Sequence, residues 1–174
     1  MTRDDVTPEQ VLETVRGALE DAEVEFEPGV RDGELVVSLP GERKLKTVAS
    51  LVIGEHDLAA TAFVIRHPDE NEQAFNRHLL RRNLRMTLLT YAVDDTGDVY
   101  VRGRIPLRAV TKELVDQLLG MLLEAADDPF NELLLLGFRS SMQKEWDWRV
   151  SRGESLRNLE AFRSVLQREG DPGA

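Results

Sequence analysis

The sequence predicts an α+β domain, in which an antiparallel β-sheet is packed by helices. Three observations support this fold class. A capped amphipathic helix opens the chain, segments with strand-like alternation follow between residues 24 and 105, and helical segments fill residues 111–167. Because the predicted strands are joined mainly by short turns, neighbouring strands should pair in antiparallel fashion.

The first helix is predicted to begin at Pro8. Thr7 is a preferred N-cap residue, Pro8 suits the first helical position, and Gln10 can complete a capping box. An apolar stripe at helical spacing follows, formed by Val11, Leu12, Val15 and Leu19. The helix should end near Asp21, with this stripe as its buried face.

Four strands are predicted to follow, at residues 24–26, 34–39, 44–53 and 57–67. Pro28-Gly29 and Asp32-Gly33 are turn signals between the first two strands. Gly54-Glu55-His56 joins the last two strands and has the length of a hairpin link. The four strands therefore form one antiparallel series.

Residues 73–112 hold the elements around which the rest of the domain is arranged. Phe75 and Leu79 lie on one face of a helix, which Asn83 is predicted to end in a left-handed conformation. Met86–Val93 is apolar on both alternating faces, which is typical of a central strand. Residues 99–105 alternate like a half-exposed strand, and a polar turn joins these two strands.

The C-terminal third is predicted to be helical. Thr111 caps a long helix whose apolar side chains cover about half its circumference, wider than the stripe of a surface helix. Asp128-Pro129 begins a second helix that is apolar nearly all round, and Gly137 can interrupt it locally. Ser151–Gly153 forms a hinge before a last amphipathic helix at residues 154–167. We predict a single domain over residues 1–168, followed by a flexible tail at 169–174.

Composition narrows the range of functions. The 174 residues are 41% hydrophobic and 31% charged, which permits a folded core. No apolar run is long enough to span a membrane, no signal peptide is recognised, and cysteine is absent, so we expect a cytoplasmic protein. The net charge of −10 disfavours nucleic acid and anionic lipid as main partners.

No motif for catalysis or metal binding is recognised. The three histidines, His56, His67 and His78, lack the spacing of a metal site. The turn at Asp94–Asp98 lacks the glycine position and closing glutamate of a calcium loop. Ser140-Ser141 lies on no nucleophile elbow, and phosphate-binding glycine motifs are missing. We therefore expect no enzyme activity, no cofactor and no metal.

Two sets of residues are candidates for binding. Residues 73–112 carry 8 basic and 3 acidic side chains, so this arginine-rich segment can hold an anion. Its candidate site residues are Arg77, Arg81, Arg82, Arg85, Arg102 and Arg104. The favoured alternative is that these arginines pair with acidic side chains of the same fold. Trp146 and Trp148 form the second set: one indole should point inward, while the other can anchor a partner or pack over a helix end.

Three stretches carry a resemblance to a known family: LLRRNLRM at Leu79–Met86, AVDDTGDVYVRGRIPL at Ala92–Leu107, and the segment from FNELLLLGF to EWDWRVSRGESLRNLEAF at Phe130–Phe162. They resemble the YbjN-domain family of bacterial proteins, its actinobacterial branch most closely, over roughly residues 8–166. The resemblance implies a fold similar to that of type III secretion chaperones, small acidic homodimers that hold segments of client proteins. Family members are described as sensory-transduction regulators, and the shared motifs are structural rather than catalytic.

The function we predict is therefore that of a non-enzymatic, chaperone-like or regulatory module that binds a protein partner. The alternative is a small-ligand sensor that binds an anionic metabolite through the arginine-rich segment. Self-association is also predicted, because the apolar arcs of the two long helices exceed what one sheet face covers. Leu114, Leu118, Leu122 and Leu135 are the candidate residues of the homodimer interface. Coverage by C-terminal helices of the same chain is the monomeric alternative.

Overall fold

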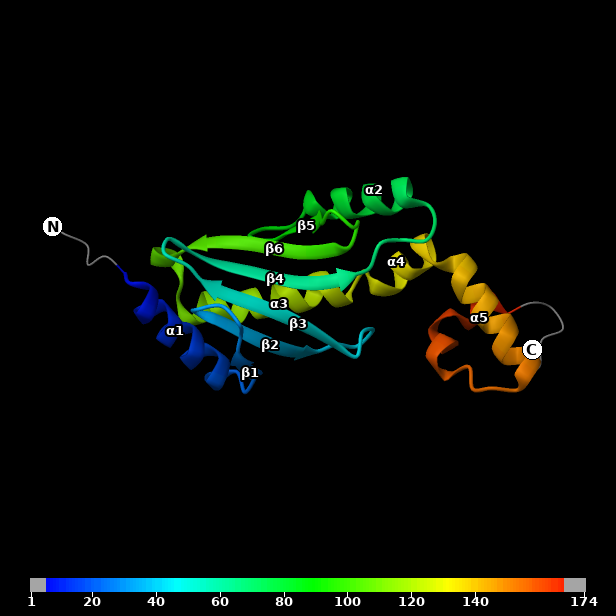
Figure 1. The fold of residues 1–174 in the computed structure, drawn as a ribbon, viewed down its shortest axis with the longest axis horizontal. Coiled ribbons are helices and arrows are strands. Elements are labelled where there is room, and N and C mark those ends of the chain that lie inside the picture. Colours follow the sequence, from blue (N-terminus) through cyan, green and yellow to red (C-terminus); the bar gives the residue numbers. More distant parts are fainter. Residues whose placement is uncertain (1–5, 168–174) are drawn as a thin grey trace. The chain divides into compact units, whose positions relative to one another are not determined.

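The computed structural model describes residues 6–167, and Figure 1 traces the chain. The chain divides into two compact units. Among the described residues, the sheet unit consists of 6–67 and 78–130, and the helical unit consists of 68–77 and 131–167. The single domain over residues 1–168 stays a prediction, and the tail at 169–174 lies outside the described residues.

The sheet unit contains six strands in one antiparallel sheet. The strands are β1 (Glu25–Pro28), β2 (Glu34–Pro40), β3 (Lys46–Ile53), β4 (Asp57–Ile65), β5 (Thr90–Val93) and β6 (Val99–Pro106). Their order across the sheet is β1-β2-β3-β4-β6-β5. The α+β fold class with an antiparallel sheet is confirmed.

The prediction of a central strand at Met86–Val93 is wrong. Only Thr90–Val93 forms a strand, and this strand, β5, lies at the edge of the sheet. Leu88 has a left-handed backbone with φ 56°, so the chain turns just before the strand begins. Of Met86 to Leu89, only Leu89 is buried, and Leu88 is 46% exposed. The apolar residues of this segment therefore give the sequence pattern of a buried strand without forming one.

Two helices pack against one face of the sheet (Figure 1). The helix α1 (Pro8–Asp21) begins with the predicted capping box between Thr7 and Gln10. The helix α3 (Lys112–Asp127) is capped by Thr111, whose Oγ1 accepts from the Leu114 amide, and follows a short 3₁₀ helix, η1 (Leu107–Ala109). Both helices bury their apolar stripes against inward residues such as Leu35, Leu51 and Leu58. The core of the sheet unit lies in this layer.

The opposite face of the sheet, here called the open face, carries side chains that are half-exposed or exposed. Its members alternate along each strand with the buried residues, as pleating requires. They include Val36, Val48, Ser50, Val52, Ala59, Thr61, Phe63, Tyr100, Arg102 and Arg104. A hollow of about 730 Å³ lies over part of this face.

Both edges of the sheet are protected against pairing with further strands. The edge strand β1 carries Glu25, Glu27 and Pro28, and charge and proline both hinder strand addition. At β5, the Tyr91 amide donates to Asn83 Oδ1 (2.8 Å) and Asn83 Nδ2 donates to the Tyr91 carbonyl (3.3 Å). Asn83 is the last residue of α2 (Glu72–Asn83), and the predicted left-handed conformation is wrong, since its φ is not positive.

A buried carboxylate holds the β2–β3 loop to the end of α3. Asp127 is 4% exposed and accepts hydrogen bonds from the backbone amides of Glu42, Arg43 and Lys44, the last at 2.7 Å. Lys44 Nζ in turn donates to the carbonyls of Phe63 (3.0 Å) and Val64 (2.8 Å) at the end of β4. Burial lowers the pKa of Lys44, and the charge of Asp127 opposes this shift.

The helical unit contains α4 (Phe130–Gly137), α5 (Arg139–Arg152), the 3₁₀ helix η2 (Arg157–Phe162) and the short α6 (Arg163–Leu166). The predicted break at Gly137 is confirmed, and an added Cβ there would lie 2.7 Å from Pro68 Cβ. Of the predicted hinge at Ser151–Gly153, only Gly153 interrupts the helix: Ser151 and Arg152 belong to α5, which Gly153 ends in the left-handed region.

One continuous helix at residues 154–167 was predicted, and this is wrong. The chain forms η2 and then α6, with Leu159, Phe162 and Leu166 buried. The first two of these are three residues apart, a spacing that places them on one side of a 3₁₀ helix. They pack with Met142 and Trp146 in the core of the helical unit.

Candidate binding sites

The arginines of the arginine-rich segment do not form one cluster. Arg81 and Arg82 lie in the last turn of α2, whereas Arg102 and Arg104 lie on β6 and face the open side of the sheet. Arg77 belongs to the helical unit. The structure therefore divides the six predicted residues among different places. Arg81, Arg82 and Arg85 line one hollow, whereas Arg102 and Arg104 line the hollow on the open face.

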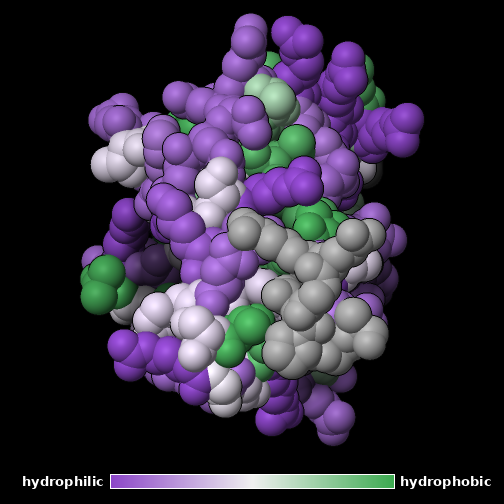
Figure 2. Space-filling view, turned by 90° about the vertical axis from the view of Figure 1, so that its right-hand side faces the viewer, coloured by the Kyte–Doolittle hydropathy of each residue, from purple (hydrophilic) through white to green (hydrophobic). Residues whose placement is uncertain are grey.

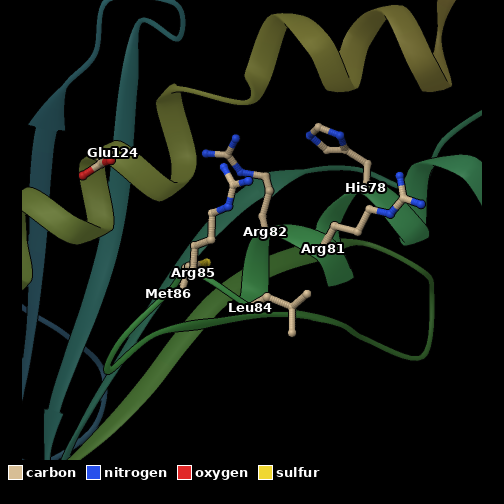
Figure 3. A pocket seen from close by; sticks show the side chains of 7 residues that line it. All are labelled: His78, Arg81, Arg82, Leu84, Arg85, Met86 and Glu124. Carbon is tan, nitrogen blue, oxygen red and sulfur yellow. The ribbon is translucent and has the colours of Figure 1, made fainter.

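This hollow, here called the arginine cavity, has a volume of about 710 Å³. His78, Arg81, Arg82, Leu84, Arg85, Met86 and Glu124 line it. In Figure 3 the side chains of His78, Arg82 and Arg85 rise from the ribbon, Arg81 extends away from Arg82 and Arg85, and Leu84 points the other way. Glu124 lines the cavity from α3. Three guanidinium groups thus share one space with a single carboxylate.

A smaller chamber of about 190 Å³ adjoins the arginine cavity. The two spaces share Arg82, Arg85, Met86 and Glu124 as lining residues. The smaller chamber is lined in addition by Thr87, Leu89, Tyr91, Met121 and Ala125. Together the two spaces fall within the size range of sites for small molecules.

Within residues 6–167, the cavity arginines Arg81, Arg82 and Arg85 form no ion pair with an acidic side chain. The last carbonyls of α2 do not need these side chains as hydrogen-bond donors. The backbone amides of Leu84 and Arg85 already donate to the carbonyls of Arg81 and Arg82. Internal pairing, the favoured alternative, holds for Arg104, whose Nη1 lies 3.2 Å from Asp57 Oδ2.

A hydrogen-bonded chain positions Arg82. Its Nε donates to Tyr91 Oη (3.3 Å), and the Tyr91 hydroxyl donates to the Ala125 carbonyl on α3 (2.6 Å). Burial raises the pKa of Tyr91, while the hydrogen bond from Arg82 and its charge lower it by less. Tyr91 is therefore neutral at physiological pH and remains a donor to α3.

The open face offers a second kind of surface. The rings of Phe63 and Tyr100 meet edge to face with centroids 5.6 Å apart, and Phe63 and Val48 are each exposed by more than two fifths. Charged groups of both signs border these apolar side chains. Glu34 accepts a hydrogen bond from Ser50 Oγ, which is the main cause of its lowered pKa.

One tryptophan points inward and the other is exposed, as predicted, and a role of either in binding stays a prediction. Trp146 is buried in the core of the helical unit, with the Arg163 guanidinium 5.6 Å from its ring centroid. Trp148 is 47% exposed, and Arg152 lies 5.2 Å from its ring.

On the face drawn in Figure 2, hydrophilic residues predominate and hydrophobic ones form small separate groups.

The four candidate interface leucines differ in accessibility. Leu118 and Leu122 are buried among the side chains of the sheet unit, so the chain itself covers them. Leu114 is half-exposed at the start of α3. Leu135 is half-exposed and packs against the core of the helical unit. The homodimer stays a prediction, with Leu114 and Leu135 as its accessible members.

Sequence reasoning missed several lining residues of the arginine cavity. Tyr91, Met121 and Glu124 lie beside Arg82 because β5 and α3 bring them there. Nothing in the local pattern of α3 singles out Met121 or Glu124, since one reads as core and the other as solvated surface. Among residues 6–167, no group of His, Cys, Asp or Glu side chains suited to a metal ion is found.

The arrangement of one antiparallel sheet with its helices defines the fold class shared by YbjN proteins and type III secretion chaperones. The model of the YbjN family, described as "Putative bacterial sensory transduction regulator", matches residues 11–135. The chain belongs to the YbjN family, and the resemblance inferred from sequence is confirmed.

Curated relatives come from mycobacteria. An uncharacterised protein of Mycobacterium leprae is 55% identical over 148 residues, which cover 84% of this chain and 80% of that protein. An uncharacterised protein of Mycobacterium tuberculosis is 49% identical over 156 residues, with 87% and 85% covered.

Two solved structures share the fold. YbjN of E. coli matches with a TM-score of 0.51 and 14% identity, covering 68% of this chain and 89% of that one. The ExsC–ExsE complex matches with a TM-score of 0.51 and 18% identity, covering 72% of this chain and 95% of that one. At these identities the likeness concerns the fold. No helix within residues 6–167 combines the length and apolar character that a membrane crossing demands.

Proposed function

We propose that this protein is a non-enzymatic, chaperone-like or regulatory module of the bacterial cytoplasm, which binds a protein partner on its open face. The observation that carries this proposal is the apolar strip on that face. Val36, Val48, Val52, Phe63 and Tyr100 keep part of their surface in water although they lie on a six-stranded sheet. Family membership and the shared fold support a regulatory, protein-binding role.

The strand register places the strip across neighbouring strands. Ser38 pairs with Val48, Val52 pairs with Ala59, and Phe63 pairs with Tyr100. Ala49 pairs with Ala62, so Val48 and Phe63 are neighbours on the open face. Burying such side chains contributes about 25 cal/mol per Å² of apolar surface. A partner that covers the strip therefore gains affinity without any change in the sheet.

The chemistry of the surroundings describes the partner. Arg102 and Arg104 border the strip on β6, while Glu34 and Asp57 border it on other strands. A segment with apolar anchors and flanking charges of both signs complements this face. Asn83 and the charges of β1 hinder strand addition, so the partner should lie across the sheet rather than extend it. The net charge of −10 argues against nucleic acid as the partner.

The test uses two matched substitutions. Val48→Glu places a charge in the strip, and Val30→Glu places the same charge at a valine that is fully exposed in the turn before β2. Proteins retained from the source cell by wild type and Val30→Glu, but lost with Val48→Glu, are candidate partners. Titration with the purified candidate should show at least about tenfold weaker binding to Val48→Glu, which equals 1.4 kcal/mol. Equal binding by both variants contradicts the proposal.

A second candidate function is a sensor for a small anionic ligand. The specific observation in its favour is that Arg81, Arg82 and Arg85 line one cavity without an ion pair among the described residues. A ligand that binds only the folded state raises the melting temperature by mass action. A thermal-shift screen of anionic metabolites therefore tests the sensor independently of the open face.

A further inference from the structure

We propose that the arginine cavity binds a small organophosphate, with its phosphate among Arg81, Arg82 and Arg85 and a compact apolar body in the adjoining chamber. This inference rests on the sensor, the second candidate function, and names the class of its ligand. Three features of the cavity support this ligand class: its charge, the positioning of Arg82, and the size of the smaller chamber.

The head group is argued from charge and donor geometry. A phosphomonoester carries close to two negative charges and three terminal oxygens, whereas a carboxylate has one charge and two oxygens. Each guanidinium presents a planar fork of N–H donors that matches phosphate oxygens. Three such forks line the cavity, against the single carboxylate of Glu124. The balance of charge therefore favours a doubly charged ligand.

Arg82 is held ready for such a ligand. Tyr91 Oη accepts its Nε–H, and Tyr91 is itself tied to the Ala125 carbonyl. The remaining N–H groups of the guanidinium are left for a ligand, because Arg82 has no other side-chain partner within residues 6–167. A side chain that is already ordered loses less rotamer entropy on binding.

The body of the ligand is limited by the smaller chamber. A dry cavity of about 150 Å³ can hold one benzene molecule, and this chamber measures about 190 Å³. Met86, Leu89 and Met121 line it, and methionine adapts its shape to a flat ring. Glu124 lines both spaces, so it can accept a hydrogen bond from a hydroxyl or amino group at the join.

Isothermal titration calorimetry with three probes tests the proposal. Phenyl phosphate supplies head and body, inorganic phosphate supplies the head alone, and benzoate supplies a ring with a carboxylate. We expect phenyl phosphate to bind at least about tenfold more tightly than either of the other two. Its affinity should fall as salt rises, because the cavity is partly open to water.

Substitutions locate the binding. Arg85→Ala and Arg81→Ala should each weaken phenyl phosphate about tenfold or more, the effect of losing one charge-assisted contact. Arg108→Ala, at an exposed arginine outside the cavity, should change the affinity less than about twofold. Met121→Trp should fill the smaller chamber and weaken phenyl phosphate while sparing inorganic phosphate. The substituted side chains are exposed or half-exposed, so each variant should still fold. Thermal melts followed by circular dichroism check this.

The outcomes separate this inference from the sensor function on which it rests. Benzoate binding as tightly as phenyl phosphate would overturn the assignment to phosphate and leave an anion sensor standing. No heat from any probe up to about 10 mM would overturn both. Equal losses with Arg85→Ala and Arg108→Ala would show general charge attraction and would also overturn the proposed site.

Discussion

At the scale of single residues, Asp127 is the polar side chain whose loss should cost most. It accepts backbone amides of Glu42, Arg43 and Lys44 while only 6% of its side chain is exposed. Asp127→Ala leaves several donors without an acceptor, and each such donor costs about 1–3 kcal/mol. Some amides will find water, so we expect a loss of about 3 kcal/mol in the free energy of unfolding. Urea denaturation measures this loss.

The neighbouring carboxylate provides the control. Asp128 pairs with Arg43 at 2.9 Å, but both side chains are well exposed. Exposed pairs contribute at most about 1 kcal/mol, so Asp128→Asn should change stability by less than that. If Asp127→Ala lowers the free energy of unfolding no more than Asp128→Asn does, water satisfies the three amides. The contact between Asp127 and the β2–β3 loop would then contribute little to stability.

Tyr91 should give stability a dependence on alkaline pH. At neutral pH, Tyr91→Phe removes the hydrogen bond to Ala125 and should cost about 1 kcal/mol. Burial raises the pKa of Tyr91 in the folded state, so the folded state holds this proton more tightly than the unfolded chain. The contribution of the neutral Tyr91 hydroxyl to the free energy of unfolding is therefore complete below the unfolded pKa of about 10. It is lost as pH rises through the pKa of the folded state.

Urea denaturation at neutral pH and above about pH 10 compares wild type with Tyr91→Phe. The difference in stability between the two proteins should shrink at the higher pH, because only wild type loses the buried neutral phenol. A constant difference would mean that Tyr91 titrates as it does in the unfolded chain.

At the scale of secondary structure elements, Asn83 is the residue that closes the edge of β5. Its side-chain amide pairs with both backbone groups of Tyr91. Asn83→Ala should expose these groups, reduce stability by about 1–2 kcal/mol, and speed hydrogen exchange at the Tyr91 amide. Exchange followed by NMR or mass spectrometry measures the effect on the strand directly.

Gln117→Ala is a suitable control, since Gln117 is exposed on α3 and away from the edge. It should leave exchange at Tyr91 unchanged. Slow exchange at Tyr91 in Asn83→Ala would contradict the role of Asn83, because another group would then be protecting the strand.

Helix starts and most strands could be predicted from the sequence, because their signals are local. Thr7 and Thr111 cap helices where the capping rules place them, and β2 to β4 follow from alternation and turns. The segment Met86–Leu89 was misread because its apolar residues match the pattern of a buried strand, whereas the chain turns at Leu88 and buries only Leu89. The η2–α6 segment was misread because helical spacing does not distinguish 3₁₀ from α over a few residues.

The candidate site could be predicted only in part. The basic character of Arg81, Arg82 and Arg85 is visible in the sequence, but their separation from Arg102 and Arg104 follows from strand order. The hydrogen bonds from the amides of Glu42 and Lys44 to Asp127 join segments that are far apart in the chain. No local sequence pattern predicts such a contact.

At the scale of the whole molecule, the open question is self-association. We predict a homodimer in which Leu114 takes part in the interface, because this leucine stays half-exposed on α3. About 800 Å² buried on each subunit would be sufficient for a stable pair. Light scattering after size exclusion should give a mass of about two chains, and Leu114→Glu should shift it toward the 19.7 kDa of one chain.

Leu135→Glu is the less informative substitution, because Leu135 packs against the core of the helical unit. It should destabilise the fold as well as any dimer. Gln117→Glu adds the same charge at an exposed position of α3 and serves as the control for Leu114→Glu. A wild-type mass near one chain across micromolar concentrations would defeat the dimer prediction.

The contact between Asp127 and the β2–β3 loop also bears on the order in which the chain folds. It joins residues 83–85 positions apart, whereas the hairpins from β1 to β4 join near neighbours. Closing so long a loop has a high entropic cost, so contacts of this kind form late. Asp127→Ala should therefore speed unfolding in stopped-flow measurements and leave the refolding rate nearly unchanged. The end of α3 would then dock after the strands of the sheet have paired. Its contact with the β2–β3 loop would control the unfolding rate, and so the lifetime of the native state.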